Sequence, residues 1–132
     1  MTVFIDTSAF IAVLDQDDEN HARARKGWEK LLSSEAVLLC SNYVLVETLA
    51  LLQNRLGMDA VTAFQEDIAP LLTIEWIDAA THHAAVTTMI GVGRKKLSLV
   101  DCASFDVMRA LGIRSAFTFD RHFKEQGFEC LP

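Results

Sequence analysis

Three aspartates of this chain stand where apolar segments give way to helical ones. Asp6 follows the run VFI in MTVFIDTSAF, Asp120 follows SAFTF, and Asp101 lies in KLSLVDCASF near the start of a helical pattern. Each has an ordinary structural role available, because Asp, Ser and Thr are preferred caps of helix N-termini. Ser98 and Asp101 also have the S-x-x-D spacing of a capping box. Taken singly, these aspartates favour capping over chemistry.

Glu47, in YVLVETLALL, cannot be explained in this way. It lies in the middle of a helical pattern among apolar neighbours, far from either end. A buried carboxylate is costly unless it is paired, protonated or bound to a metal ion. An ion pair with an arginine from elsewhere in the fold, such as Arg55 or Arg109, is the alternative to a metal.

Taken together, the four acids predict a metal site. Two carboxylates ~5 Å apart repel each other by about 3 kcal/mol at an effective dielectric constant of ~20, so Asp6, Glu47, Asp101 and Asp120 need a positive partner if they meet. Oxygen ligands without thiolates suit hard cations, and Mg²⁺ or Mn²⁺ is expected. Such an ion activates a bound water and stabilises charge on phosphate oxygens. The predicted chemistry is therefore phosphodiester hydrolysis without a protein nucleophile.

Side chains beside these acids are expected to support them. Ser8 can add a hydroxyl ligand or order a bound water. Thr118, two residues before Asp120, points to the same face of the predicted strand and can orient a ligand. His122 is close enough in sequence to Asp120 to touch the site, although a place on the surface of a helix is equally open.

The elements that position these acids follow from the apolar periodicity. Short β-rich runs are expected at 3–5, 36–40, 73–77, 115–119 and 128–131, and helices at 8–14, 21–32, 41–56, 59–68, 79–90 and 99–111. This alternation predicts an α/β fold with a mostly parallel sheet of four or five strands and helices on both faces. The carboxyl ends of such strands meet at one edge, where Asp6 and Asp120 should project.

Length and composition bound the class of protein. A chain of 132 residues that is 51% hydrophobic is expected to form one domain over residues 1–132 with a true core. No apolar run approaches the ~20 residues needed to span a bilayer, so no membrane association is expected. Three cysteines without a CxxC spacing indicate reduced thiols in a cytoplasmic protein.

The charge is unusual for a protein that binds nucleic acid. The formal net charge is −6, whereas affinity for phosphate chains normally comes from Lys and Arg. The basic triplet Arg94, Lys95 and Lys96, with Arg121, can nevertheless hold an RNA backbone beside an acidic pocket. A solvated loop is the alternative explanation of the triplet.

The motifs resemble those of the PIN-domain family, and in particular its short toxins of the VapC type. The segments FIDTSAF, ETLALL, LSLVDCASF and FTFDRHFKEQGF match the family's acidic motifs in order and spacing, nearly from end to end. The resemblance implies a single Rossmann-like domain acting as a metal-dependent endoribonuclease, with Asp6, Glu47, Asp101 and Asp120 as the metal-binding and catalytic acids.

The resemblance also distributes the roles of these acids. Asp6 and Asp101 are assigned to the main metal position, and Glu47 is expected to bind metal or to orient the attacking water. The metal contact of Asp120 is left open, because Arg121 and His122 stand where some relatives carry a further acid.

Similar proteins are toxins of toxin–antitoxin pairs that cut RNA to stop translation. They usually form homodimers, and a small antitoxin blocks them by laying a segment over the acidic pocket. Two other functions remain possible from the residues. A receiver-like signalling domain would need paired acids after the first strand, where this chain has only Asp6. A catalytically silent interaction module would use the acidic groove to bind a basic peptide.

Overall fold

The sheet is parallel and carries the first strand of the chain at its centre. A computed structural model of the protein describes residues 1–93 and 97–132. The strands are β1 (Thr2–Ile5), β2 (Val37–Ser41), β3 (Thr73–Glu75), β4 (Ser115–Phe117) and β5 (Glu129–Leu131). They are ordered β3-β2-β1-β4-β5, and all four pairings are parallel. The predicted α/β fold with a parallel sheet is confirmed.

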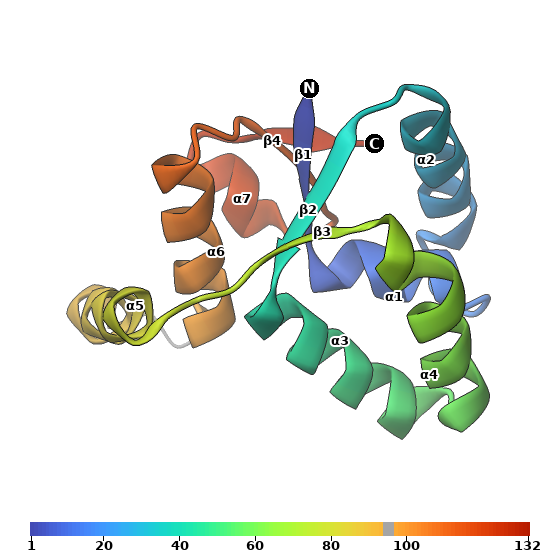
Figure 1. The fold of residues 1–132 in the computed structure, drawn as a ribbon, viewed down its shortest axis with the longest axis horizontal. Helices are drawn as coiled ribbons and strands as arrows, with labels where there is room; N and C mark the ends of the chain where they lie inside the picture. Colours follow the sequence, from blue (N-terminus) through green and yellow to red (C-terminus); the bar gives the residue numbers. More distant parts are fainter. Residues whose placement is uncertain (94–96) are drawn as a thin grey trace.

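Helices cover both faces of this sheet (Figure 1). They are α1 (Thr7–Leu14), α2 (His21–Ser33), α3 (Asn42–Arg55), α4 (Met58–Ala63), α5 (Ala79–Val92), α6 (Leu99–Ala110) and α7 (Arg121–Glu125). Phe4 of β1 faces α7, with its ring 6.2 Å from that of Phe123, whereas Phe117 of β4 faces α2, with its ring 6.4 Å from that of Trp28. Because side chains alternate along a strand and Val3, Phe4 and Ile5 are all fully buried, the first strand is buried on both sides. No helix of the described ranges has the length and apolar character needed to cross a membrane.

Three predicted elements differ from those observed, and one of them is the strand expected at 73–77, which ends at Glu75. The single helix expected at 59–68 is α4 followed by a π-helical segment, Phe64–Ile68, and a short 3₁₀ turn, Ala69–Leu71. Phe64 and Ile68 are both buried, and Pro70, which has no N–H to donate, closes the segment. The strand expected at 115–119 ends at Phe117, because the N–H of Phe119 bonds to the hydroxyl of Ser8 at 3.0 Å instead of to a strand.

Helix α2 approaches β4 so closely that it requires glycine. A Cβ on Gly27 would lie 2.8 Å from Cε2 of Phe117 and 2.9 Å from Cβ of Pro132. Phe117 is fully buried and cannot move away. We expect Gly27→Ala to lower the free energy of unfolding by about 1–3 kcal/mol in urea denaturation.

Gly91→Ala in α5 is the matched control, since nothing lies within 4 Å of its added Cβ. This variant should be unchanged or more stable by up to about 1 kcal/mol, the difference in helix propensity. Equal behaviour of the two variants would contradict close packing at Gly27.

Candidate active site

Asp6 is both a helix cap and a buried acid at the end of β1. It is the N-cap of α1, and its Oδ2 accepts hydrogen bonds from the N–H of Ser8 at 3.4 Å, from Oγ of Ser8 at 2.7 Å and from Oγ1 of Thr118 at 3.0 Å. Among the described residues, no hydrogen bond reaches its Oδ1. The capping role and the metal-binding role are therefore compatible, because they use different oxygens.

Ser8 and Thr118 tie the ends of two strands together through this carboxylate. Each hydroxyl donates to Asp6 and accepts one backbone N–H: Ser8 from Phe119 at 3.0 Å, and Thr118 from Asp120 at 3.0 Å. The single hydrogen of each hydroxyl is thereby used on Asp6. This network fixes the chain after β4 beside the chain after β1, and so fixes the position of Asp120.

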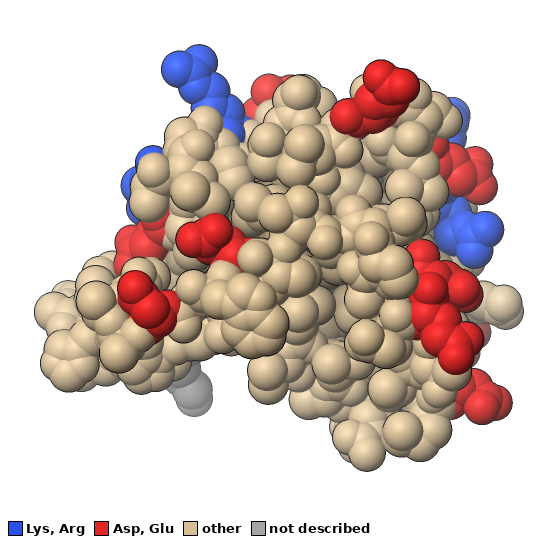
Figure 2. Space-filling model, viewed as in Figure 1, with Lys and Arg blue, Asp and Glu red and all other residues tan. Residues whose placement is uncertain are grey.

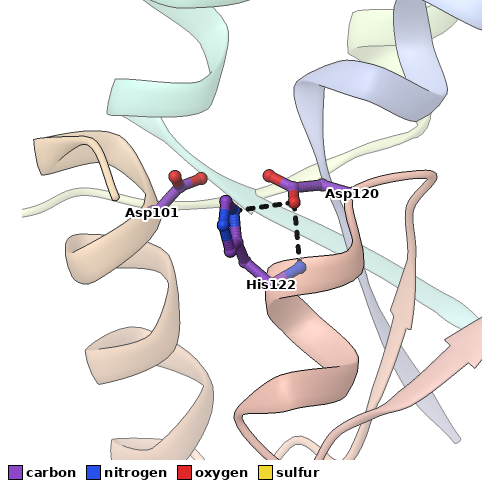
Figure 3. Close-up of side chains that lie close together, drawn as sticks. All are labelled: Asp101, Asp120 and His122. Carbon is purple, nitrogen blue, oxygen red and sulfur yellow. Dashed lines mark hydrogen bonds and ion pairs between the residues drawn. The ribbon is translucent and has the colours of Figure 1, made fainter. Parts of the chain in front are cut away.

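Asp101 and Asp120 come from two different helix starts and face each other. Asp101 completes the capping box of α6, in which its Oδ2 accepts the N–H of Ser98 at 3.1 Å. Asp120 is the N-cap of α7, and its Oδ1 accepts the N–H of His122 at 2.9 Å. One ligand atom from each of Asp101, Asp120 and His122 lies within 4.8 Å of the others. Figure 3 shows these three side chains close together.

Glu47 reaches the same place from the second turn of α3 and is half-buried. The alternative of an arginine partner is not observed within the described ranges, where Glu47 has no ion pair. Arg109 instead donates to Oε1 of Gln126 at 2.8 Å. Arg55 lies on the wall of the same cleft as Glu47 without forming an ion pair to it.

The four predicted acids all line one cleft of about 360 Å³. Three of them stand at helix N-termini, where the backbone dipoles favour negative charge and offset part of the mutual repulsion. Asp6 and Glu47 lie outside the tighter cluster of Asp101, Asp120 and His122, although Asp6 was assigned to the main metal position. The cleft is also lined by residues that the sequence did not single out as site residues, namely Thr7, Ile11, Asp18, Asn20, Leu51, Arg55 and Phe119.

The electrostatics of this cleft favour a bound cation. Burial raises the pKa of Asp6 from 3.8 to about 6, against the opposing hydrogen bonds of Ser8 and Thr118, and the charges of Asp101 and Asp120 raise it further. Burial also raises the pKa of Asp101 and that of Glu47, with Asp120 adding to both. Acids that disfavour their own charge in this way are stabilised by a positive ion. These donors, carboxylates with one imidazole, fit a divalent cation.

Of the four basic residues predicted to bind RNA, Arg121 lies in the described part of the structure. Arg94, Lys95 and Lys96 lie outside the described residues. Arg121 is exposed on the first turn of α7, next to Asp120, with its Nε 3.7 Å from Oε1 of Glu125. Figure 2 shows a face on which Asp and Glu lie in several separate places and Lys and Arg only near the margin. The negative charge is therefore not confined to the cleft, and an RNA chain would depend on a few local cations.

The known proteins that this chain is similar to belong to the family that its motifs resemble. The sequence matches the PIN domain family over residues 3–129. It is 34% identical over 127 residues to the 23S rRNA-specific endonuclease VapC20 of Mycobacterium tuberculosis, covering 96% of this chain and 95% of that protein. The crystal structure of VapC20, described as a Sarcin-Ricin loop cleaving toxin, has a TM-score of 0.84 and 32% identity, covering 98% of this chain and 99% of that one.

More distant structures share the fold. FitAcB of Neisseria gonorrhoeae has a TM-score of 0.69 at 16% identity, covering 100% of this chain and 97% of that one. VapBC2 of Rickettsia felis, solved with a DNA fragment from their promoter, has a TM-score of 0.71 at 13% identity, covering 98% and 97%. The match over residues 3–129, the 34% identity to VapC20 and the shared architecture agree that this chain belongs to the PIN-domain family and is a homologue of a VapC-type nuclease.

Proposed function

We propose that residues 1–132 form one domain that acts as a Mg²⁺- or Mn²⁺-dependent endoribonuclease. The observation that carries the proposal is the convergence of Asp6, Glu47, Asp101 and Asp120 on one cleft. These acids come from four separate segments. Neighbouring carboxylates repel one another, so bringing four of them together does not serve the stability of the fold. A relative 34% identical over nearly the whole chain is named as an endonuclease.

In this proposal the acids have different roles in catalysis. Asp6, Asp101 and Asp120 hold the ion, which supplies an activated water and stabilises negative charge on the phosphate. Ser8 and Thr118 hold the carboxylate of Asp6 in place. For Asp6, the cap bonds use only Oδ2 and leave Oδ1 without a hydrogen bond among the described residues.

Glu47 is suited to receive a proton from the attacking water. Its pKa is raised, first by burial and then by the charges of Asp101 and Asp120, against the effect of the Thr7 hydroxyl. A carboxylate with a raised pKa accepts a proton more readily at neutral pH, which is what general base catalysis requires.

The RNA backbone is proposed to lie over the cleft, with its phosphates contacted by Arg121, by Arg55 on the cleft wall and by the triplet at 94–96. Such contacts fix the register of the RNA without reading its sequence. Because they are electrostatic, RNA binding should weaken as salt is raised.

Ribosomal RNA is the first substrate to test, since VapC20 is described as specific for 23S rRNA and as cleaving the Sarcin-Ricin loop. Purified ribosomes and naked RNA would be incubated with the protein in Mg²⁺, Mn²⁺ or EDTA, and new 5′ ends mapped by primer extension. A discrete, metal-dependent cut supports the proposal. Absence of metal-dependent cleavage of any RNA would favour the silent interaction module.

The biological role we propose is that of a cytoplasmic toxin held in check by an antitoxin protein. The similarity to VapC20, which is a toxin, supports this role. Expression of the chain alone should arrest growth, and co-expression with the neighbouring open reading frame should relieve the arrest. Growth arrest that the neighbouring frame leaves unchanged would contradict that partner.

We also propose that the protein is a homodimer that uses an exposed apolar surface at β3 and α3. Trp76 is 71% exposed and Val46 is 68% exposed. The two segments are joined, because the N–H of Ile77 bonds to Oδ1 of Asn42 at the start of α3 at 2.7 Å. Large exposed apolar side chains of this kind are typical of an interface.

Trp76→Glu is therefore expected to convert the dimer into a monomer, as measured by light scattering after size exclusion. Because Trp76 is exposed, the change should leave the circular dichroism spectrum of the chain unaltered. Leu111→Glu, at an exposed position at the end of α6, is the control and should remain dimeric. A monomeric wild type, or an unchanged mass for Trp76→Glu, would overturn the homodimer.

A further inference from the structure

His122 is a buried side chain without the hydrogen bonds that a buried imidazole needs. Its side chain is 9% exposed, and within the described ranges neither Nδ1 nor Nε2 has a hydrogen-bond partner. Leaving a buried polar group unpaired destabilises the fold. The ring lies between the carboxylates of Asp101 and Asp120, as Figure 3 shows.

The contact with Asp120 has the distance of an ion pair and is drawn as a dashed line in Figure 3, but it lacks the alignment of a hydrogen bond from the ring. Nδ1 lies 2.9 Å from Oδ1 of Asp120, yet the direction of the ring nitrogen is not aligned for a hydrogen bond to that oxygen. The same oxygen is already used by the backbone N–H of His122 at 2.9 Å. A simple ion pair would aim the ring N–H at the carboxylate, so the arrangement calls for another partner.

We propose that Nδ1 of His122 is a direct ligand of the divalent ion, together with Asp101 and Asp120. This inference deepens the proposed function and rests on it, since it assumes that the cleft binds a divalent ion. Neighbouring ligands of an octahedral ion with bonds of ~2.1 Å stand about 3 Å apart. The distance of 2.9 Å between Nδ1 and Oδ1 of Asp120 has this spacing.

The local structure holds His122 ready for this role. Asp120 caps α7 by accepting the N–H of His122, so the ring and the carboxylate are fixed on one helical turn. The phenyl ring of the next residue, Phe123, is fully buried against Phe4 and Phe105, which anchors that turn to the core. The position of the ring relative to the carboxylate of Asp120 is therefore fixed by the core.

A nitrogen ligand changes which ion the site prefers. Carboxylates and water suit Mg²⁺, whereas imidazole suits first-row transition ions, whose affinities rise from Mn²⁺ along the series. A site of carboxylates with one imidazole should therefore bind Mn²⁺ more tightly than Mg²⁺. Replacing His122 should reduce this preference without abolishing binding by the carboxylates.

The test is spectroscopy of Mn²⁺ bound to the full-length protein. Electron spin echo envelope modulation detects the ¹⁴N nucleus of an imidazole that coordinates Mn²⁺ directly. The wild type should show this coupling, His122→Gln should lose it, and His83→Gln, at an exposed histidine of α5, should retain it. In competition titrations, His122→Gln should lower the ratio of Mn²⁺ to Mg²⁺ affinity by about tenfold.

His122→Asp separates a ligand from a merely structural histidine. If His122 is a ligand, an aspartate can replace it as an oxygen donor, so Mg²⁺ binding should be retained or tightened while the ¹⁴N coupling disappears. If His122 serves only to pair with Asp120, His122→Asp should leave the ratio of Mn²⁺ to Mg²⁺ affinity at its wild-type value, whereas loss of a nitrogen ligand lowers that ratio.

The remaining outcomes distinguish this inference from the proposed function. Mn²⁺ that binds to the wild type with no ¹⁴N coupling, and is lost on Asp101→Asn, would overturn the histidine ligand and leave the nuclease proposal standing. Mn²⁺ that does not bind, or whose binding is unaffected by Asp101→Asn, would overturn both.

Discussion

Asp6→Asn is expected to reduce metal-dependent RNA cleavage by more than about 100-fold. The substitution removes a charge from the cleft but keeps an oxygen that can accept the bonds of Ser8 and Thr118 at 2.7 and 3.0 Å. The loss should exceed the 10–100-fold that follows from changing a residue behind a metal ligand, because a ligand itself is weakened. Initial rates of cleavage of a labelled RNA, at saturating Mn²⁺ and at Mg²⁺, measure the effect.

Asp78→Asn is the matched control for this variant. Asp78 is also an Asp at a helix N-cap, where it accepts the N–H of Thr81 at 2.9 Å, but it belongs to α5 and does not line the cleft. The Asp78→Asn variant should cleave RNA at the wild-type rate. Equal activity of Asp6→Asn and Asp78→Asn would mean that Asp6 has only the capping role that its position after β1 allows.

The metal-free protein is expected to become more stable as the pH falls from about 7 towards 4, relative to the Asp6→Asn variant. The pKa of Asp6 is raised by burial from 3.8 to about 6, so between these values the folded state binds a proton that the unfolded chain does not. Stability must then decrease as the pH rises through this range. This difference in the pKa of Asp6 between the folded and unfolded states corresponds to about 3 kcal/mol of unfolding free energy. The raised pKa values of Asp101 and Glu47 contribute in the same direction.

Urea denaturation in EDTA from pH 4 to 7.5 measures this effect, as the difference in unfolding free energy between the wild type and Asp6→Asn. The difference should favour the variant at pH 7.5 and shrink towards pH 4. Adding Mn²⁺ to the wild type at pH 7.5 should restore stability, by about 2.7 kcal/mol at 100 times the dissociation constant. A difference that is independent of pH, or no metal effect on the wild type, would show that Asp6 is not a destabilised carboxylate in a cation site.

The sequence by itself determined the architecture and singled out Asp6, Glu47, Asp101 and Asp120, four of the acids that line the cleft. Short apolar runs that alternate with segments of helical periodicity are enough to predict a parallel α/β sheet. The period of the apolar residues in each segment shows which sides of that element are buried. An acid directly after the central strand must lie at the carboxyl edge, which is why the convergence of Asp6 and Asp120 on one cleft could be expected. Glu47 was identifiable because no local role explains a mid-helix acid among apolar residues.

A capping role does not exclude a metal-binding role for the same aspartate. The sequence offered capping as the simpler role for Asp6, Asp101 and Asp120, and all three do form cap bonds. A carboxylate has two oxygens, however, and the cap bonds of Asp6 use only Oδ2. Residue type and spacing cannot show how the two oxygens of one group are divided.

Only the tertiary structure decided the details that set the chemistry. The sequence could not show that β4 ends early because Ser8 takes the N–H of Phe119, or that Asp18 and Arg55 line the cleft. It left His122 equally open to the surface and the site, whereas the ring is buried beside Asp101 and Asp120. The physical reason is that local sequence sets the period and the ends of each element, while distances of a few ångströms between segments far apart in the chain depend on how the elements pack.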